Sequence, residues 1–348
     1  SSEYAPSFIP GTDKVAYLAA DKEGMMQLWM MNADGSDRKQ ISFEASDVND
    51  YLFSPCGKKV ILVKTVNHES SVQENDADLK LTTGIVANDL MYKHWDHYTK
   101  SAPHPFLADF DGNKVGESKD LLEGEPYECP MLPFGGVEQL AWSPDSKQIA
   151  YTCRKLTGLD YAISTDSDIY LYDIATGAVK NLCKPEGYVR PKCDPTRSLK
   201  DQAVNQFKED VNAGYDQNPQ FSPDGKYIAW SSMERDGYES DRTRLCIYEF
   251  ASGKKTYVTE SFESGVNEFA WAKDNNTLYF SGVWHGRTNL YQTNLKGEVK
   301  QITDEVADYV LLGVHPDGKQ LLTKCHSMSR ADEVYLVNIA DGKKTQLT

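Results

Sequence analysis

One turn motif recurs along this chain and constrains its fold more than any other feature. Its clearest copy is FSPDGK at 221–226, within the stretch 215–232, and the apolar run Tyr227–Trp230 follows it. Proline presets φ in such a turn and glycine supplies a positive φ, so the motif predicts a tight reversal between two strands. Related turns that lead into apolar runs stand at 53–58, 142–147 and 314–319, with weaker copies at 8–14 and 271–276. The chain is therefore built from a repeated strand–turn–strand unit.

A second repeated feature lies downstream of these turns. A strand ends in a glycine-containing hairpin at Tyr172–Gly177, Tyr248–Gly253 and Leu336–Gly342, and a further short strand follows each hairpin. Together the repeats define six modules of four strands, at about 4–43, 48–122, 136–183, 215–260, 264–304 and 307–348. Four antiparallel strands in a period of about 40–50 residues predict an all-β fold, a single β-propeller domain with six visible blades. An ordinary sandwich does not explain turns that recur at matched places in the modules.

The composition excludes some classes of partner. Of the 348 residues, 40% are hydrophobic and 26% charged, which is ordinary for a globular protein. The apolar runs are strand-sized, so we expect no membrane insertion. The net charge of −15 would repel a phosphate backbone, so we expect no nucleic-acid partner. The sequence does not open with the charged and then apolar segment of a targeting peptide, so we expect a mature or trimmed fragment.

The seven cysteines form no C-x-x-C pair, which excludes a zinc ribbon and a thioredoxin motif. Cys153 and Cys246 fall within or beside expected strands, where a thiol behaves as a small hydrophobe. Cys183 and Cys193 bracket a loop and could form one disulfide, and the sequence leaves that pairing open.

The modules are spaced unevenly, and the additional residues gather in three insertions, at 67–104, 155–168 and 184–214. We expect weak helical character at 76–91 and a short amphipathic helix at 198–211. In a four-strand meander, the turns between strands one and two and between three and four share one face. The two-to-three loops and the links between modules share the other face. The insertions therefore lie opposite the tight turns, with the enlarged polar loops 233–244 and 326–332, and such loops often carry function.

Common catalytic motifs are absent from the sequence. The segment GESKD at 116–120 lacks the last glycine of a G-x-S-x-G nucleophile elbow, and no phosphate-binding, dinucleotide-binding or H-E-x-x-H motif occurs. The cluster His94-Trp95-Asp96-His97 matches no strong zinc spacing, so we expect contact residues there, and neither a metal nor a cofactor. The lack of a catalytic triad disfavours a complete enzyme built around the central funnel of the propeller.

A recognition surface on the loop-rich face is the better expectation. Aromatic side chains give contact area at little entropy cost, and carboxylates could hold a cation such as a peptide amino terminus. The candidate substrate-binding residues are Trp95, Asp96, Asp160, Tyr161, Glu234, Tyr238, Glu239, Asp241, Arg242, Trp284 and Arg287. The alternative reading is that Glu239, Asp241 and Arg242 only close their own loop through local ion pairs.

The FSPDGK-type turns, each followed by an apolar strand, resemble the WD-like repeats of TolB and of propellers in the prolyl oligopeptidase family of serine peptidases. Three loop motifs narrow the resemblance, at Asp89–Asp96, Asp160–Tyr170 and Gly237–Arg242. These motifs are similar to those of dipeptidyl-peptidase-5-like members of the acylaminoacyl-peptidase branch, and a TolB-type propeller is not expected to carry them. The resemblance runs over the whole chain, and the loop motifs are more specific than the turns.

The resemblance implies a two-part serine peptidase. In that family an amino-terminal propeller caps a carboxy-terminal α/β-hydrolase domain that bears the Ser-Asp-His triad, and the active site lies between them. This chain would be the noncatalytic propeller of a dipeptidyl or oligopeptidase, with the hydrolase domain of the same parent chain as its partner. It would gate the access of short peptides and help to bind their amino-terminal end. Glu239 or Asp96 is the hypothetical anchor of the substrate amine, although no double-Glu motif is visible.

The same resemblance implies further expectations. Family propellers commonly have seven or eight blades, so we expect another blade before Ser1 and the hydrolase domain after Thr348. Relatives in Gram-negative bacteria are often periplasmic, which suggests a periplasmic location. The alternative function is a stand-alone, TolB-like propeller that binds a protein partner on its loop face.

Overall fold

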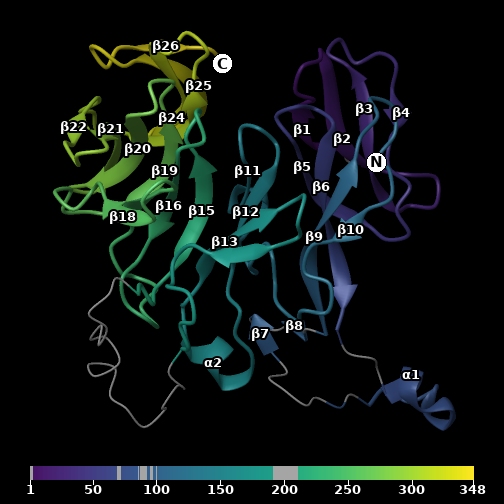
Figure 1. The fold of residues 1–348 in the computed structure, drawn as a ribbon. Coiled ribbons are helices and arrows are strands. Elements are labelled where there is room, and N and C mark those ends of the chain that lie inside the picture. Colours follow the sequence, from purple (N-terminus) through teal and green to yellow (C-terminus); the bar gives the residue numbers. More distant parts are fainter. Residues whose placement is uncertain are drawn as a thin grey trace. The chain divides into compact units, whose positions relative to one another are not determined.

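The computed structural model describes residues 3–68, 72–84, 86, 92–94, 97–98, 100–190 and 211–348. These residues form six four-stranded antiparallel sheets and one two-stranded hairpin. The chain divides into two compact units, residues 1–181 with 186–198, and residues 182–185 with 199–348. Each unit holds three of the sheets, which we number blades 1 to 6 along the chain (Figure 1). The fold is a six-bladed β-propeller, which confirms the predicted fold class.

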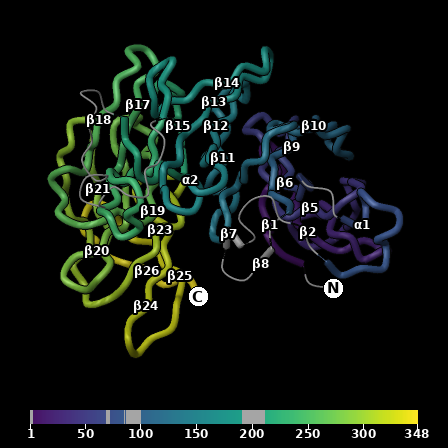
Figure 2. Tube along the Cα trace, turned by 90° about the horizontal axis from the view of Figure 1, so that it is seen from below, coloured from purple at the N-terminus to yellow at the C-terminus, as the bar shows by residue number. Residues whose placement is uncertain are grey.

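The first unit contains blades 1 to 3. Blade 1 is β1 (Tyr4–Phe8), β2 (Lys14–Ala20), β3 (Met26–Asn32) and β4 (Lys39–Gln40). Blade 2 is β5 (Val48–Phe53), β6 (Lys59–Asn67), β9 (Ser101–Asp109) and β10 (Lys119–Asp120). Blade 3 is β11 (Leu140–Trp142), β12 (Gln148–Cys153), β13 (Asp168–Asp173) and β14 (Val179–Asn181). The connections add α1 (Val72–Asn75), η1 (Ala77–Leu79), β7 (Tyr92–His94), β8 (His97–Tyr98), η2 (Val137–Gln139) and α2 (Gly158–Ile163). Figure 2 shows the strands of blade 2 side by side in the order β10, β9, β6, β5.

The second unit contains blades 4 to 6. Blade 4 is β15 (Asp216–Phe221), β16 (Tyr227–Ser232), β17 (Arg244–Glu249) and β18 (Lys254–Tyr257). Blade 5 is β19 (Val266–Trp271), β20 (Thr277–Trp284), β21 (Arg287–Asn294) and β22 (Lys300–Gln301). Blade 6 is β23 (Asp308–Val314), β24 (Gln320–Ser327), β25 (Arg330–Asn338) and β26 (Lys344–Gln346).

The second strand of blade 2 shows why the strands that follow the repeated turns contain unbroken apolar runs. In β6, Val60 and Leu62 belong to the hydrophobic core between blades 1 and 2. The alternate residues Ile61 and Val63 belong to the core between blades 2 and 3. Successive side chains of a strand point to opposite faces, and blade packing covers both faces, so every position in the run is apolar.

The second unit repeats this packing at its own middle blade. In β20, Leu278 and Phe280 lie in the core that blade 5 shares with blade 4. Tyr279 lies between them in the strand and belongs to the core shared with blade 6. Within each unit the blades therefore stack face to face in chain order.

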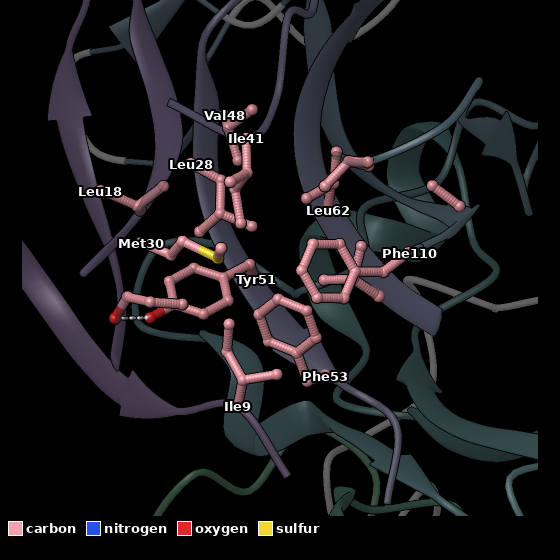
Figure 3. Packing of buried hydrophobic residues seen from close by; sticks show 14 residues of the cluster. Ile9, Leu18, Leu28, Met30, Ile41, Val48, Tyr51, Phe53, Leu62 and Phe110 are labelled. Atoms are coloured by element: carbon pink, nitrogen blue, oxygen red, sulfur yellow. Dashed lines mark hydrogen bonds between the residues drawn. The ribbon is translucent and has the colours of Figure 1, made fainter. Parts of the chain in front are cut away.

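Tyr51 combines apolar packing with a hydrogen bond in the first of these cores (Figure 3). Its ring meets Phe53 edge-on at 5.9 Å between ring centroids. Its hydroxyl donates to the carbonyl oxygen of Ala16 at 2.7 Å, which links blade 2 to blade 1. Burial raises the pKa of Tyr51 to about 12, so the phenol remains a donor at neutral pH.

The tight turns close through the serine of the repeated motif. Its Oγ accepts a hydrogen bond of 2.9–3.0 Å from a backbone N–H five residues ahead, as at Ser54, Ser143 and Ser222. Gly57 supplies the positive φ of its turn at +66°, whereas Ser146 takes a similar φ of +60° in the matching turn. The motif therefore works through a side-chain cap as well as through backbone freedom.

Gly57 and Gly318 occupy matching turns and allow a steric prediction. Both have positive φ, at +66° and +69°, but a Cβ on Gly57 would lie 2.4 Å from the carbonyl oxygen of Pro10, whereas a Cβ on Gly318 would meet nothing within 4 Å. We expect Gly318→Ala to cost about 1–2 kcal/mol through backbone conformation alone. Gly57→Ala should cost at least about 1 kcal/mol more, because blade 1 would have to shift. Urea denaturation followed by circular dichroism measures both, and equal losses would contradict the clash.

Some sequence expectations about connections need correction. The segment 326–332 is no enlarged loop, because β24 runs to Ser327 and β25 starts at Arg330. Weak helical character was expected at 76–91; in the described part of that range η1 is helical, and α1 ends just before it at Asn75. Most of the helix expected at 198–211 lies outside the described residues. Within the described part of the chain, no helix has the length and apolar character to cross a bilayer.

Candidate functional site

The loops that carry the predicted site residues lie at the opposite end of their strands from the tight turns. In blade 3 the turn at 143–148 joins β11 to β12, and α2 fills the connection from β12 to β13 at the other end. Figure 1 places α2 and the β7–β8 hairpin at the same end of the first unit. The antiparallel order of the strands therefore separates tight turns from insertions in this unit.

A buried polar cluster connects α2 to the link between blades 2 and 3. Tyr161 is 6% exposed, and its hydroxyl donates to Oε2 of Glu128, which is 4% exposed, at 2.6 Å. The guanidinium of Arg154 stacks on the Tyr161 ring, 4.0 Å from its centroid. Burial, followed by the Glu128 carboxylate, raises the pKa of Tyr161, so its hydroxyl keeps its proton.

A second arginine joins the same cluster. Arg190 Nη2 donates to Ser164 Oγ at 2.8 Å, and its Nε lies 3.7 Å from Oδ2 of Asp166. Arg154 Nη1 donates to the Ser164 carbonyl at 2.9 Å, so both guanidinium groups meet at this serine. We call Glu128, Arg154, Tyr161, Ser164, Asp166 and Arg190 the blade-3 cluster. Four of its members are buried: Glu128, Tyr161, Ser164 and Asp166. Its hydrogen bonds connect α2 to the neighbouring segments of blade 3.

The loop between β16 and β17 is closed by its own ion pair. Arg235 Nη2 lies 2.6 Å from Oδ1 of Asp241, and the backbone N–H of Arg235 donates to the other carboxylate oxygen at 3.0 Å. Burial alone raises the pKa of Asp241, but the hydrogen bonds from Arg235 outweigh it and the pKa is lowered. The Arg235 guanidinium also lies 4.3 Å from the Tyr238 ring centroid. Asp241 therefore closes its own loop through a local ion pair, as the alternative states for this residue.

Two further arginines anchor the end of that loop. Arg242 Nη2 lies 2.8 Å from Oε2 of Glu260, and Arg244 Nη1 lies 2.9 Å from Oε1 of the same carboxylate. Arg244 is largely buried over the Tyr257 ring at 4.1 Å, and its Nη1 lies 3.7 Å from Glu234. Arg242 and Glu234 thus belong to a network of ion pairs that includes Arg244 and Glu260.

Glu239 is the most available carboxylate among the candidates of this loop. It is exposed and accepts one long hydrogen bond, 3.3 Å, from the Tyr215 hydroxyl. Unlike Asp241, it is not matched to a guanidinium group of its own loop. An exposed carboxylate beside a phenol is suited to receive an ammonium group from a ligand.

The remaining candidates have separate surroundings. Trp284 and Arg287 pair across a two-residue hairpin in blade 5, where Trp284 stacks on His285 at 4.5 Å and Arg287 lies 3.2 Å from Asp304. Asp160 is half-buried in the first turn of α2. Trp95, Asp96 and Cys193 lie outside the described residues. The structure thus groups Glu234, Tyr238, Glu239, Asp241 and Arg242 on one loop, and Asp160 with Tyr161 on α2.

Sequence reasoning missed the partners of Tyr161. Glu128 lies in the link between blades 2 and 3, to which the sequence analysis gave no role. The predicted modules end at 122 and start again at 136, so the sequence already indicated a long link on the loop-rich face. Arg154 directly precedes the predicted insertion 155–168, and Arg190 lies within the predicted insertion 184–214. The thiols of Cys153 and Cys246 are fully buried in β12 and β17, as predicted.

A pocket of about 530 Å³ lies elsewhere in the first unit, between the link after β4 and the β9–β10 loop. Lys64 lines it and lies 2.5 Å from Oε2 of Glu44 and 2.8 Å from Ser118 Oγ. Lys64 therefore joins a carboxylate and a hydroxyl at one wall of the pocket. None of the predicted site residues lines this pocket.

Comparison with known proteins agrees with this architecture. Residues 163–332 match the family described as the dipeptidyl peptidase IV N-terminal region. The chain aligns over 99% of its length with the acylaminoacyl peptidase of Pyrococcus horikoshii, at 16% identity and a TM-score of 0.65, covering 45% of that chain. It also aligns with the β-propeller domain of the trilobed protease from Pyrococcus furiosus, over 99% of this chain and 84% of that one, at 16% identity and a TM-score of 0.58. At such identities the two structures support the fold alone.

The chain is a β-propeller domain of the dipeptidyl-peptidase and prolyl oligopeptidase family. A curated relative is dipeptidyl-peptidase 5 of Porphyromonas gingivalis, which is 40% identical over 100% of this chain. The chain spans 47% of that protein, so it covers about half the length of this relative. The predicted family resemblance is confirmed.

Proposed function

We propose that this propeller is the noncatalytic part of a serine dipeptidyl peptidase, where it gates access to the active site and binds the amino-terminal end of the peptide. The observation that carries the proposal is the likeness along the whole chain to a protein named dipeptidyl-peptidase. The catalytic residues would belong to a hydrolase domain of the same parent chain. We also propose a periplasmic location, as the family resemblance implies.

Two features of the loop-rich ends support the binding role. The buried hydrogen bonds of the blade-3 cluster fix the position of α2, and a pre-organised element lowers the entropy cost of ordering a peptide. Glu239 offers an exposed carboxylate next to a phenol, and a charge-assisted hydrogen bond to an ammonium group is stronger than a neutral one. Gating is the second part of the proposal and derives from the fold: a ring of rigid blades admits a short extended peptide and excludes a folded chain.

The test uses the full-length protein that contains this chain, with dipeptide substrates that release a chromophore. We expect the protein to hydrolyse substrates that have a free amino terminus. A serine-directed inhibitor should abolish this hydrolysis. Glu239→Gln should raise KM for these substrates by about tenfold or more, since a hydrogen bond to a charged group contributes about 1.5–3 kcal/mol. The same change should leave KM unaltered for an N-acetylated substrate.

Glu117→Gln is the matched control, because Glu117 is an exposed carboxylate in the β9–β10 loop, at the tight-turn end of its blade. An equal KM shift in both variants would refute the role of Glu239 and leave the peptidase proposal standing. A full-length protein that cleaves no dipeptide substrate, and binds a protein partner through its loop face, would instead support the stand-alone propeller.

A further inference from the structure

His104, on β9 of blade 2, is buried with one ring nitrogen oriented by a carboxylate. It is 0% exposed, and its Nδ1 lies 2.9 Å from Oδ2 of Asp120 on β10. Asp120 also accepts the backbone N–H of Leu122 at 2.8 Å, which fixes the carboxylate. Because a carboxylate accepts, Nδ1 is the donor to Asp120, and in a neutral ring the lone pair is then on Nε2. That Nε2 is buried and has no hydrogen-bond partner among the described residues.

A second imidazole stands next to His104. His68 follows the end of β6, where its N–H donates to the Lys100 carbonyl at 2.9 Å and extends the β6–β9 ladder. The two rings lie with centroids 5.1 Å apart and planes inclined at 42°. Small Ala102 lies between these two positions in the ladder and leaves room for the rings to approach.

The separation suits two ligands of one metal ion. With Zn–N bonds of about 2.1 Å and a tetrahedral angle, two imidazoles on one zinc have ring centroids roughly 5 Å apart. Buried metal-binding histidines almost always donate their other ring N–H to a carboxylate, which is the role that Asp120 has toward His104. A buried lone pair without a donor is unfavourable, and a bound cation would remove that cost.

We propose that His68 and His104 bind a divalent transition-metal ion, with zinc as the reference ion and Asp120 as the residue that orients His104. Two imidazoles leave two positions on the metal for water. This site is distinct from the HWDH segment considered in the sequence, and it lies at the base of the same insertion. The insertion starts after β6, and the bound ion would hold its first residues against β9.

The nearby charges do not oppose a cation. Lys64 faces His104 directly across the β6–β9 ladder, but its ammonium group is neutralised by Glu44 at 2.5 Å. Asp120 places a carboxylate 2.9 Å from Nδ1 of His104, which favours a cation at the opposite side of the ring.

The test titrates the whole chain with zinc chloride in competition with a chromophoric chelator, and with cobalt(II) for its tetrahedral absorption bands. We expect one ion per chain at pH 7.5 and weaker binding at acid pH, because protons compete with the metal for the imidazole nitrogens. His68→Ala should weaken zinc binding at least tenfold, and Asp120→Asn by about 10–100-fold.

His326→Ala is the matched control, because His326 also has its Nδ1 beside a carboxylate, Asp332 at 2.9 Å, but its side chain in blade 6 is 44% exposed. The His326→Ala variant should bind zinc with the same affinity as the unmodified protein. Half-buried His68 is the primary variant, and circular dichroism checks that each variant is folded. No stoichiometric zinc in the unmodified protein, or binding that survives both His68→Ala and His104→Asn, would overturn the proposal.

Discussion

Replacing Trp230 by alanine is expected to lower the free energy of unfolding by about 3–5 kcal/mol. Trp230 is 1% exposed in β16, at the end of the apolar run that follows the clearest copy of the repeated turn. Its Nε1–H donates to Oδ1 of Asp216 at 2.8 Å, so the alanine would leave both a cavity and a buried carboxylate with one donor fewer.

Trp230→Phe separates these two contributions. It removes the indole N–H with the five-membered ring and keeps a six-membered ring in the core, so most of the packing remains and the expected loss is about 1–3 kcal/mol. Denaturation by urea, followed by far-ultraviolet circular dichroism, measures both variants. A loss for Trp230→Ala no larger than for Trp230→Phe would show that the hydrogen bond, and not the packing, holds this blade.

Removing the Glu128 carboxylate is the second change with a large expected effect. Glu128→Ala should cost about 3–5 kcal/mol, because it breaks a buried polar pair and leaves the Tyr161 hydroxyl without its acceptor beside the Arg154 guanidinium. Tyr161→Phe removes the same hydrogen bond from the other side. The double variant should cost less than the sum of the two single changes, since they share one interaction.

Glu117→Ala is the control for Glu128, as an exposed carboxylate of the same unit. Its expected effect lies within about 0.5 kcal/mol. If Glu128→Ala were equally mild, or if the effects of Glu128→Ala and Tyr161→Phe simply added, the hydrogen bond between them would not contribute to stability.

The blade-3 cluster shows why part of the candidate site escaped sequence reasoning. Tyr161 was singled out because it lies in a loop motif, but its acceptor lies 33 positions earlier, in a link that no motif marks. Asp241 shows the opposite case. It was proposed for substrate binding, yet its carboxylate is held by Arg235 from the same loop. An ion pair and a ligand contact require the same residue types, so only the distance between side chains separates them.

The amino-acid sequence by itself determined the repeated turns, the apolar strands and hence the propeller, because these depend on local rules: which residue tolerates a positive φ, and which face of a strand is covered. The tertiary structure alone decided which charges meet, as with Glu128 and Tyr161 or His104 and Asp120. Such pairs join side chains from different segments, and their energy depends on burial and on distances of a few tenths of an ångström. No periodicity along the chain encodes those distances.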